Sequence, residues 1–150
     1  MSRSHLSQER FAPRAAFALA AAVVAALLLL APRTTLWDRD ESRFARSAVE
    51  MLSSGDFLVP TFAGELRPHK PPLLPWLMAL STSVLGPTEV AFRLWSALAH
   101  GASVLLTFAA GRRLAGGTSP LLGAALLALS PLALLEGAAA TADGDRKSVV

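Results

Sequence analysis

The chain has 150 residues, no cysteine and a formal net charge of +3 at pH 7. Hydrophobic residues make up 53% of it, and residues 15–31, 94–111 and 116–135 contain no charge at all. A soluble domain would need polar faces on helices of that length, so the composition indicates an all-α, polytopic helical membrane protein. The absence of cysteine excludes a disulfide framework and thiolate chemistry. No basic run with interleaved aromatic residues is present, so we expect membrane lipids and not nucleic acid as partners.

The first transmembrane helix is predicted at residues 15–31, which are 17 consecutive apolar residues. A crossing needs roughly 17–25 such residues. The tail 1–14 carries three arginines against one glutamate, so the positive-inside rule places it in the cytoplasm. A cleavable signal peptide is the alternative, but residues 31–33 (Ala-Pro-Arg) form a poor cleavage site.

The segment 32–70 is predicted to be an external loop, because its six basic and six acidic residues cancel. Asp38 and Glu41 form a capping-box-like pair at the start of an amphipathic helix at about 39–54. Its apolar residues recur at helical spacing and are expected to rest on the membrane surface, with the carboxylates at the N-terminal end. The apolar set is Phe44, Ala48, Met51 and Leu52. An alternative is an interfacial helix whose acidic residues only cap and solubilise it.

The proline-rich stretch 68–72 is predicted to be stiff and extended, because proline restricts its own φ and the residue before it. It presents His69 and Lys70 at the membrane boundary. Lys70 suits a phosphate group, or alternatively extends to lipid headgroups. The apolar part of the following segment 71–88 covers only the 13 residues 73–85, which include three serine or threonine residues, so we predict a juxtamembrane or re-entrant helix.

Two further spans are predicted, a second at 92–111 and a third at 118–140, joined by a cytoplasmic loop at 112–117. This topology satisfies the positive-inside rule for two adjacent arginines in that loop. It also brings the start of a second external loop, 141–144, to the same face as Asp40.

Two features of the second span bear on its packing. Glu89 and Arg93 are four positions apart and are expected to support the helix as an ion pair. His100 falls within the crossing, where a neutral histidine hydrogen-bonded inside a bundle is expected.

Three motifs in this order resemble one family of membrane enzymes. They are Leu-Trp-Asp-Arg-Asp-Glu-Ser-Arg-Phe-Ala at 36–45, Glu-Met-Leu-Ser-Ser-Gly-Asp-Phe-Leu-Val-Pro at 50–60, and Lys-Pro-Pro-Leu at 70–73. They resemble the N-terminal module of the polyprenyl-phosphate-sugar-dependent membrane glycosyltransferases, which include aminoarabinose transferases acting on lipid A and protein O-mannosyltransferases. The similarity covers roughly residues 34–144.

The resemblance implies the N-terminal part of a GT-C fold, with a catalytic aspartate in its first external loop. It implies catalytic roles for Asp40 and Asp143, and a contact between Lys70 and the lipid phosphate. Aminoarabinose transferases tend to have glutamate where His69 stands, so no metal ligand is assigned and a divalent metal cofactor is left open. The residues expected to bind substrate are Lys70, Glu41, Arg43 and His69.

The implied activity is inverting transfer from a polyprenyl-phosphate sugar to a lipid, glycan or protein acceptor outside the plasma membrane. A positioned carboxylate can take the proton of the attacking hydroxyl, and a nearby cation can stabilise the leaving phosphate. The alternative is a non-catalytic membrane protein, such as a transporter segment or an assembly subunit. Residues 145–150 match a translated sequencing adaptor, which predicts an inactive gene fragment with a foreign tail; a natural basic terminus is the other interpretation.

Overall fold

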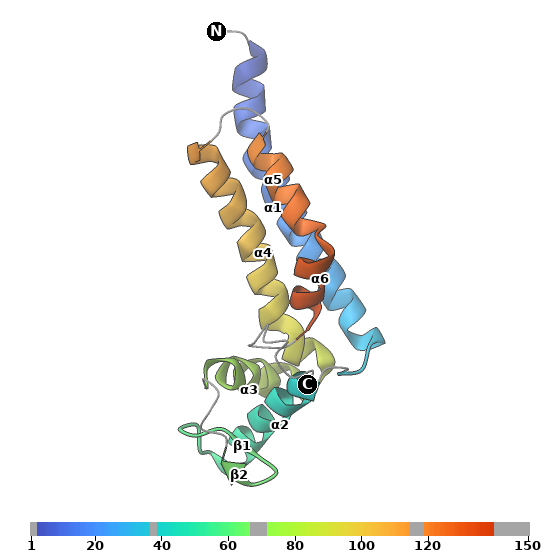
Figure 1. The fold of residues 1–150 in the computed structure, drawn as a ribbon, viewed down its shortest axis with the longest axis vertical. Coiled ribbons are helices and arrows are strands. Elements are labelled where there is room, and N and C mark those ends of the chain that lie inside the picture. The colour runs from blue at the N-terminus through green and yellow to red at the C-terminus, as the bar shows by residue number, and fades with distance from the viewer. Residues whose placement is uncertain (1–2, 37–38, 67–71, 115–118, 140–150) are drawn as a thin grey trace, which may run out of the picture.

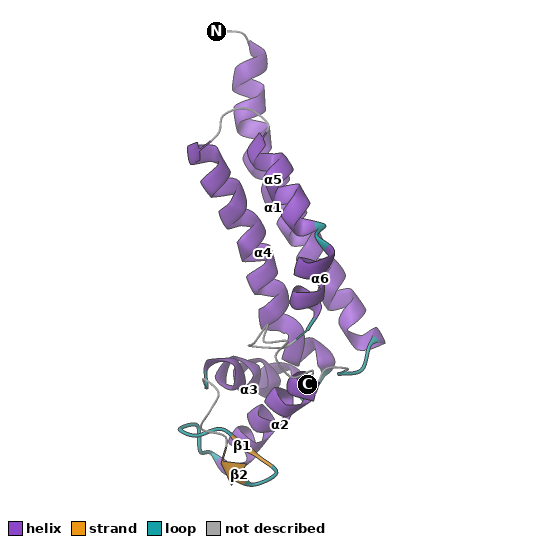
Figure 2. Ribbon diagram, in the orientation of Figure 1, coloured by secondary structure: helices purple, strands orange, loops and turns teal. Residues whose placement is uncertain are grey.

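The computed structural model describes residues 3–36, 39–66, 72–114 and 119–139. In these ranges the regular secondary structure is helical apart from a two-stranded hairpin, which confirms the predicted class of a polytopic helical membrane protein (Figures 1 and 2). The elements are α1 (Arg3–Leu30), a 3-10 turn (Ala31–Arg33), α2 (Arg39–Ser54), β1 (Thr61–Phe62), β2 (Glu65–Leu66), α3 (Leu73–Leu85), α4 (Glu89–Leu114), α5 (Ser119–Ala128) and α6 (Pro131–Ala138).

Two helical stretches in the described residues are long and apolar enough to cross a membrane, Ala12–Arg33 and Glu89–Leu114. Helix α1 begins earlier than its apolar part, at Arg3, and so continues through the predicted tail. Residues 118–140, predicted as one span, contain two helices bent by 57°. Proline has no N–H to donate and disfavours a helical predecessor, so Ser130 is extended (φ −62°, ψ 124°) and α6 starts at Pro131.

The long helices α1 and α4 pack with α5 and α6 into a bundle (Figure 1). Gly101 allows α1 and α4 to approach closely, since a Cβ there would lie 2.5 Å from Cγ2 of Val24. Small residues commonly permit such contacts between membrane helices. His100 is buried and its Nε2 lies 3.4 Å from the carbonyl oxygen of Ala128, so it is held within the bundle as the sequence predicts.

Helices α2 and α3 lie across one end of this bundle (Figure 1). A second apolar cluster joins them to α4, and its buried members include Phe44, Ala48, Met78 and Phe92. The apolar face of α2 is therefore covered by protein. The sequence pattern predicts that this face rests on the membrane surface, and that prediction is wrong for the buried residues of the cluster. Leu52, which the pattern assigns to the same face, is 37% exposed.

Helix α3 has 13 residues and lies beside α2 at the end of the bundle. At 1.5 Å per residue it is roughly 20 Å long, short of the roughly 30 Å hydrocarbon layer. One side packs through Met78 and Ala79 into the second cluster. The other side exposes an apolar stripe at helical spacing, formed by Leu73, Trp76, Leu80 and Val84.

Glu50 fastens the hairpin to α2. Its carboxylate accepts hydrogen bonds from Arg46 Nε at 2.8 Å, Thr61 Oγ1 at 2.8 Å and the Ala63 amide at 2.9 Å. The bond from Arg46, opposed by burial and aided by the bonds from Thr61, Ala63 and Gly64, lowers the pKa of Glu50 from 4.5 to about 2.

Because this pKa is lowered by folding, the ionised carboxylate stabilises the hairpin above pH 4.5, and the stabilisation is lost as the pH falls from 4.5 towards 2. We expect hydrogen-exchange protection of the Ala63 amide, corrected for intrinsic exchange, to decline across this interval. The Glu50→Gln variant should show weaker protection with no such decline. Equal pH profiles for both proteins would contradict the assignment.

Candidate functional site

The start of α2 is fastened to α4 by a buried ion pair between Glu41 and Arg93. The two side chains are 0% and 3% exposed. Arg93 Nε donates to Glu41 Oε1 at 2.6 Å, and Nη2 donates to Oε2 at 3.1 Å, so the contact is bidentate. Planar two-point pairing of this kind fixes orientation as well as distance.

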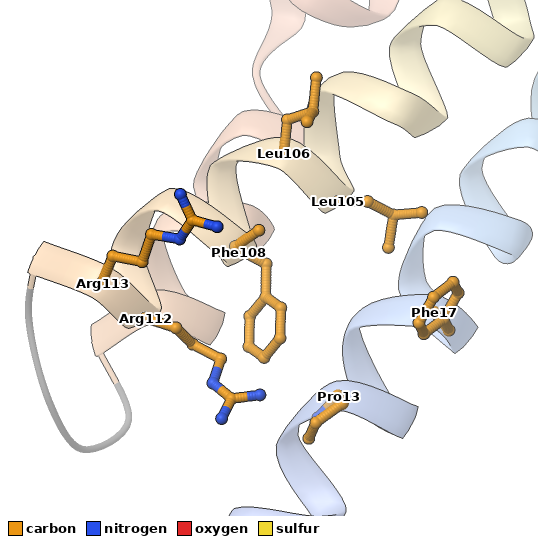
Figure 3. A pocket seen from close by; sticks show the side chains of 8 residues that line it. Pro13, Phe17, Leu105, Leu106, Phe108, Arg112 and Arg113 are labelled. Carbon is orange, nitrogen blue, oxygen red and sulfur yellow. The ribbon is translucent and has the colours of Figure 1, made fainter.

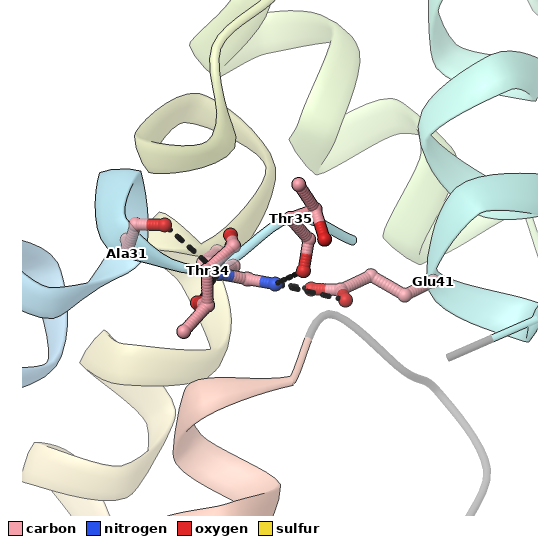
Figure 4. Close-up of polar contacts among 5 residues, drawn as sticks. Ala31, Thr34, Thr35 and Glu41 are labelled. Carbon is pink, nitrogen blue, oxygen red and sulfur yellow. Dashed lines mark hydrogen bonds and ion pairs between the residues drawn. The ribbon is translucent and has the colours of Figure 1, made fainter. Parts of the chain in front are cut away.

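The same guanidinium also binds the segment that connects α1 to α2. Nη1 donates to the carbonyl oxygens of Ala31 and Thr34, both at 2.9 Å, and to Thr34 Oγ1 at 2.6 Å. Nη2 donates to the carbonyl oxygen of Thr35 at 2.9 Å. Figure 4 shows these oxygens converging with the Glu41 carboxylate. Arg93 therefore joins the end of α1, the first turn of α2 and the first turns of α4.

The role of Arg93 differs from the one its spacing predicts. Its partner is Glu41, 52 positions earlier, and the ion pairs of the described residues include none between Arg93 and Glu89. The i,i+4 spacing in the sequence pointed to the nearby Glu89 as the partner of Arg93 and could not reveal the distant Glu41. The available signal was a lone arginine at the start of an apolar helix, because a charge buried there requires a partner.

Asp40 lies in the first turn of α2, next to the buried pair. Unlike Glu41, its side chain is 35% exposed, and it accepts a hydrogen bond from Arg43 Nη1 at 3.3 Å. Successive residues of a helix point about a quarter-turn or more apart, so Glu41 can face inward while Asp40 faces outward.

The structure thus brings three of the predicted site residues, Asp40, Glu41 and Arg43, into one helical turn. Of these, Glu41 is fully buried with both carboxylate oxygens bound by Arg93. The other three predicted site residues, His69, Lys70 and Asp143, lie outside the described residues.

This turn offers a partly exposed carboxylate and an adjacent cation, and the buried Glu41–Arg93 ion pair holds it to α4. A carboxylate held in this way can accept a proton from a hydroxyl nucleophile. The described ranges hold no cluster of three or more histidine, aspartate or glutamate side chains suited to a metal ion.

The fold defines a helical membrane protein, with Asp40, Glu41 and Arg43 in one helical turn at one end of its bundle. Residues 69–144, half of the chain, match the family model described as dolichyl-phosphate-mannose-protein mannosyltransferase. The chain therefore belongs to this family, which confirms the resemblance to membrane glycosyltransferases that use polyprenyl-phosphate sugars.

Curated relatives support the same assignment. A Pseudomonas fluorescens protein named undecaprenyl phosphate-alpha-4-amino-4-deoxy-L-arabinose arabinosyl transferase 2 is 40% identical over 69% of this chain and 18% of its own length. An Edwardsiella ictaluri arabinosyl transferase with the same donor in its name is 37% identical over 76% of this chain and 21% of its own length. An uncharacterized Aquifex aeolicus protein is 38% identical over 63% of this chain and 19% of its own length.

The chain spans about a fifth of the length of these relatives. No solved structure matches it.

Replacing Arg93 by methionine should destabilise the protein by about 3–5 kcal/mol, because the change leaves the Glu41 carboxylate buried without its partner. The matched change Arg46→Met, at an arginine that is 61% exposed, should cost less than about 1 kcal/mol. Reversible unfolding in mixed detergent micelles measures both values. Adding Glu41→Leu to Arg93→Met should recover part of the lost free energy of unfolding. Equal losses of stability for Arg93→Met and Arg46→Met would contradict a buried ion pair.

Proposed function

We propose that this chain carries the first catalytic loop of an inverting membrane glycosyltransferase. The reaction transfers a sugar from a polyprenyl phosphate to an acceptor hydroxyl on the non-cytoplasmic side of the plasma membrane. Membership of the mannosyltransferase family and the donor in the names of two relatives support this reaction class.

The observation that carries the proposal is the position of Asp40. Its carboxylate is accessible at the N-terminus of α2, while the adjacent Glu41 fixes that turn through Arg93. A catalytic base requires both properties, because the acceptor must reach it and its geometry must be held. In the proposed mechanism Asp40 takes the proton of the acceptor hydroxyl as that oxygen attacks the anomeric carbon, and the lipid phosphate leaves.

The proposed donor site combines Arg43 with residues outside the described ranges. Arg43 lies one helical turn from Asp40 and is 36% exposed, so it can reach an anionic ligand. We assign Lys70 to the phosphate of the donor, His69 to the same region, and Asp143 to the second acidic position. We assign Glu41 to the site through its hold on Arg93, because its carboxylate is buried.

The path of α3 supports an external position for this site. Its exposed apolar stripe suits a helix that lies along the lipid surface, and its 13 residues are few for a crossing. With α3 outside, α4 crosses inward and the arginines at its C-terminal end reach the cytoplasm, as the positive-inside rule favours.

The acceptor is proposed to be a lipid, glycan or protein. We further propose that the 150-residue chain alone is inactive, because three crossings offer too few helices to enclose both a lipid-linked sugar and an acceptor.

The role of Asp40 can be tested in a chimera that carries residues 34–114 of this chain in the matched region of the Edwardsiella ictaluri relative. We expect Asp40→Asn to lower sugar transfer from undecaprenyl phosphate by about 10²–10⁴-fold, because the amide cannot accept the proton. Asp56→Asn, in an exposed loop, serves as the matched control and should leave the rate unchanged. An active Asp40→Asn chimera would remove this residue from the mechanism.

The proposed orientation can be tested with single cysteines, since the native chain has none. A cysteine at position 56 should react with an impermeant thiol reagent added to intact cells. A cysteine at position 113, which is exposed at the other end of α4, should react only after permeabilisation. The reverse labelling pattern would contradict an external catalytic loop.

A further inference from the structure

A groove lies between α1 and α4 at the end of the bundle remote from α2. Its volume is about 580 Å³, within the range of roughly 300–1,000 Å³ typical of ligand sites. Its apolar lining includes Phe17, Leu105 and Phe108, and Arg112 and Arg113 stand at one end of it (Figure 3).

The two arginines give this apolar groove a positive rim. Both are exposed, and the Arg112 guanidinium lies 6.0 Å from the centre of the Phe108 ring, within reach of a cation–π contact. No ion pair between either arginine and a carboxylate occurs in the part of the chain that the structure describes. The exposed Arg14 of α1 adds positive charge at the same end.

This combination selects the chemical class of the ligand. A sugar would need hydrogen-bonding groups along the floor, and a soluble anion would gain nothing from the leucine and phenylalanine side chains there. A ligand with an anionic head and a hydrocarbon chain satisfies both parts. Arginine forks bind phosphate oxygens in pairs, and apolar side chains line the path of an acyl chain.

The groove is distinct from the proposed catalytic site. Arg112 follows Arg93 by 19 positions on α4, which at 1.5 Å per residue separates them by roughly 28 Å along the helix. A donor bound near Asp40 therefore cannot also occupy this groove with its phosphate on Arg112.

We propose that the groove binds one anionic phospholipid of the surrounding leaflet, with its phosphate on Arg112 and Arg113 and an acyl chain against Phe17 and Leu105. The inference is independent of the proposed glycosyl transfer. It requires only that the chain lies in a bilayer with this end of α4 at the headgroup level.

Native mass spectrometry of the purified 150-residue chain tests the proposal, with phosphatidylglycerol and phosphatidylcholine of identical acyl chains as probes. The wild-type chain should bind one phosphatidylglycerol in preference to phosphatidylcholine. Arg112→Gln should weaken phosphatidylglycerol binding roughly fivefold, the ratio expected for one basic residue near an anionic lipid surface. Arg33→Gln, at an exposed arginine in the 3-10 turn that follows the other end of α1, is the matched control and should leave binding unchanged.

A second variant tests the contribution of the apolar groove separately from that of the arginines. Ala109 lines the groove and is exposed, so Ala109→Trp should fill the space and weaken binding of both lipids while all charges remain. Inorganic phosphate should not displace the lipid, and circular dichroism should show equal helix content in every variant. Equal binding of the two lipids by the wild type, or an equal effect of Arg33→Gln and Arg112→Gln, would overturn the proposal.

Discussion

The arrangement of the described chain depends on where one buried guanidinium finds its acceptors. Arg93 is 3% exposed at the start of an apolar helix. Burying its charge there costs folding free energy unless its N–H donors are bound. Glu41 neutralises it, and oxygens of Ala31, Thr34 and Thr35 accept the remaining N–H groups. These acceptors all lie within residues 31–41, between 52 and 62 positions before Arg93, so satisfying a single side chain fixes how α1, α2 and α4 meet.

The Glu41–Arg93 ion pair also explains how the partly exposed carboxylate of Asp40 is positioned. Asp40 and Glu41 are adjacent, yet one is 35% exposed and the other is fully buried. The buried carboxylate of Glu41 holds the turn through Arg93, while Asp40 is partly exposed beside it and paired with Arg43. The second cluster, with Phe44 and Met78 among its members, packs the face of α2 that also carries Glu41 against α3. A proposed catalytic base therefore stands on a packed support, although it follows a connecting segment.

Apolar surface is distributed unevenly over the two ends of the molecule. Near α2, the exposed stripe of α3 lies outside the bundle and suits contact with lipid. At the far end, the α1–α4 groove combines apolar walls with two arginines. Both features follow from helices that are apolar on more than one side, because a bundle of few helices cannot cover all of that surface.

The amino-acid order alone determined the helical membrane class, the family and the approximate helix positions. Uncharged runs, helical spacing and proline positions are local properties, and the motifs at 36–45, 50–60 and 70–73 are specific without coordinates. Only the tertiary structure decided that Glu41 pairs with Arg93 over 52 positions, that α3 covers the apolar face of α2, and that residues 119–138 bend by 57°. Local periodicity cannot choose among distant partners, because burial and charge neutralisation depend on which segments meet in space.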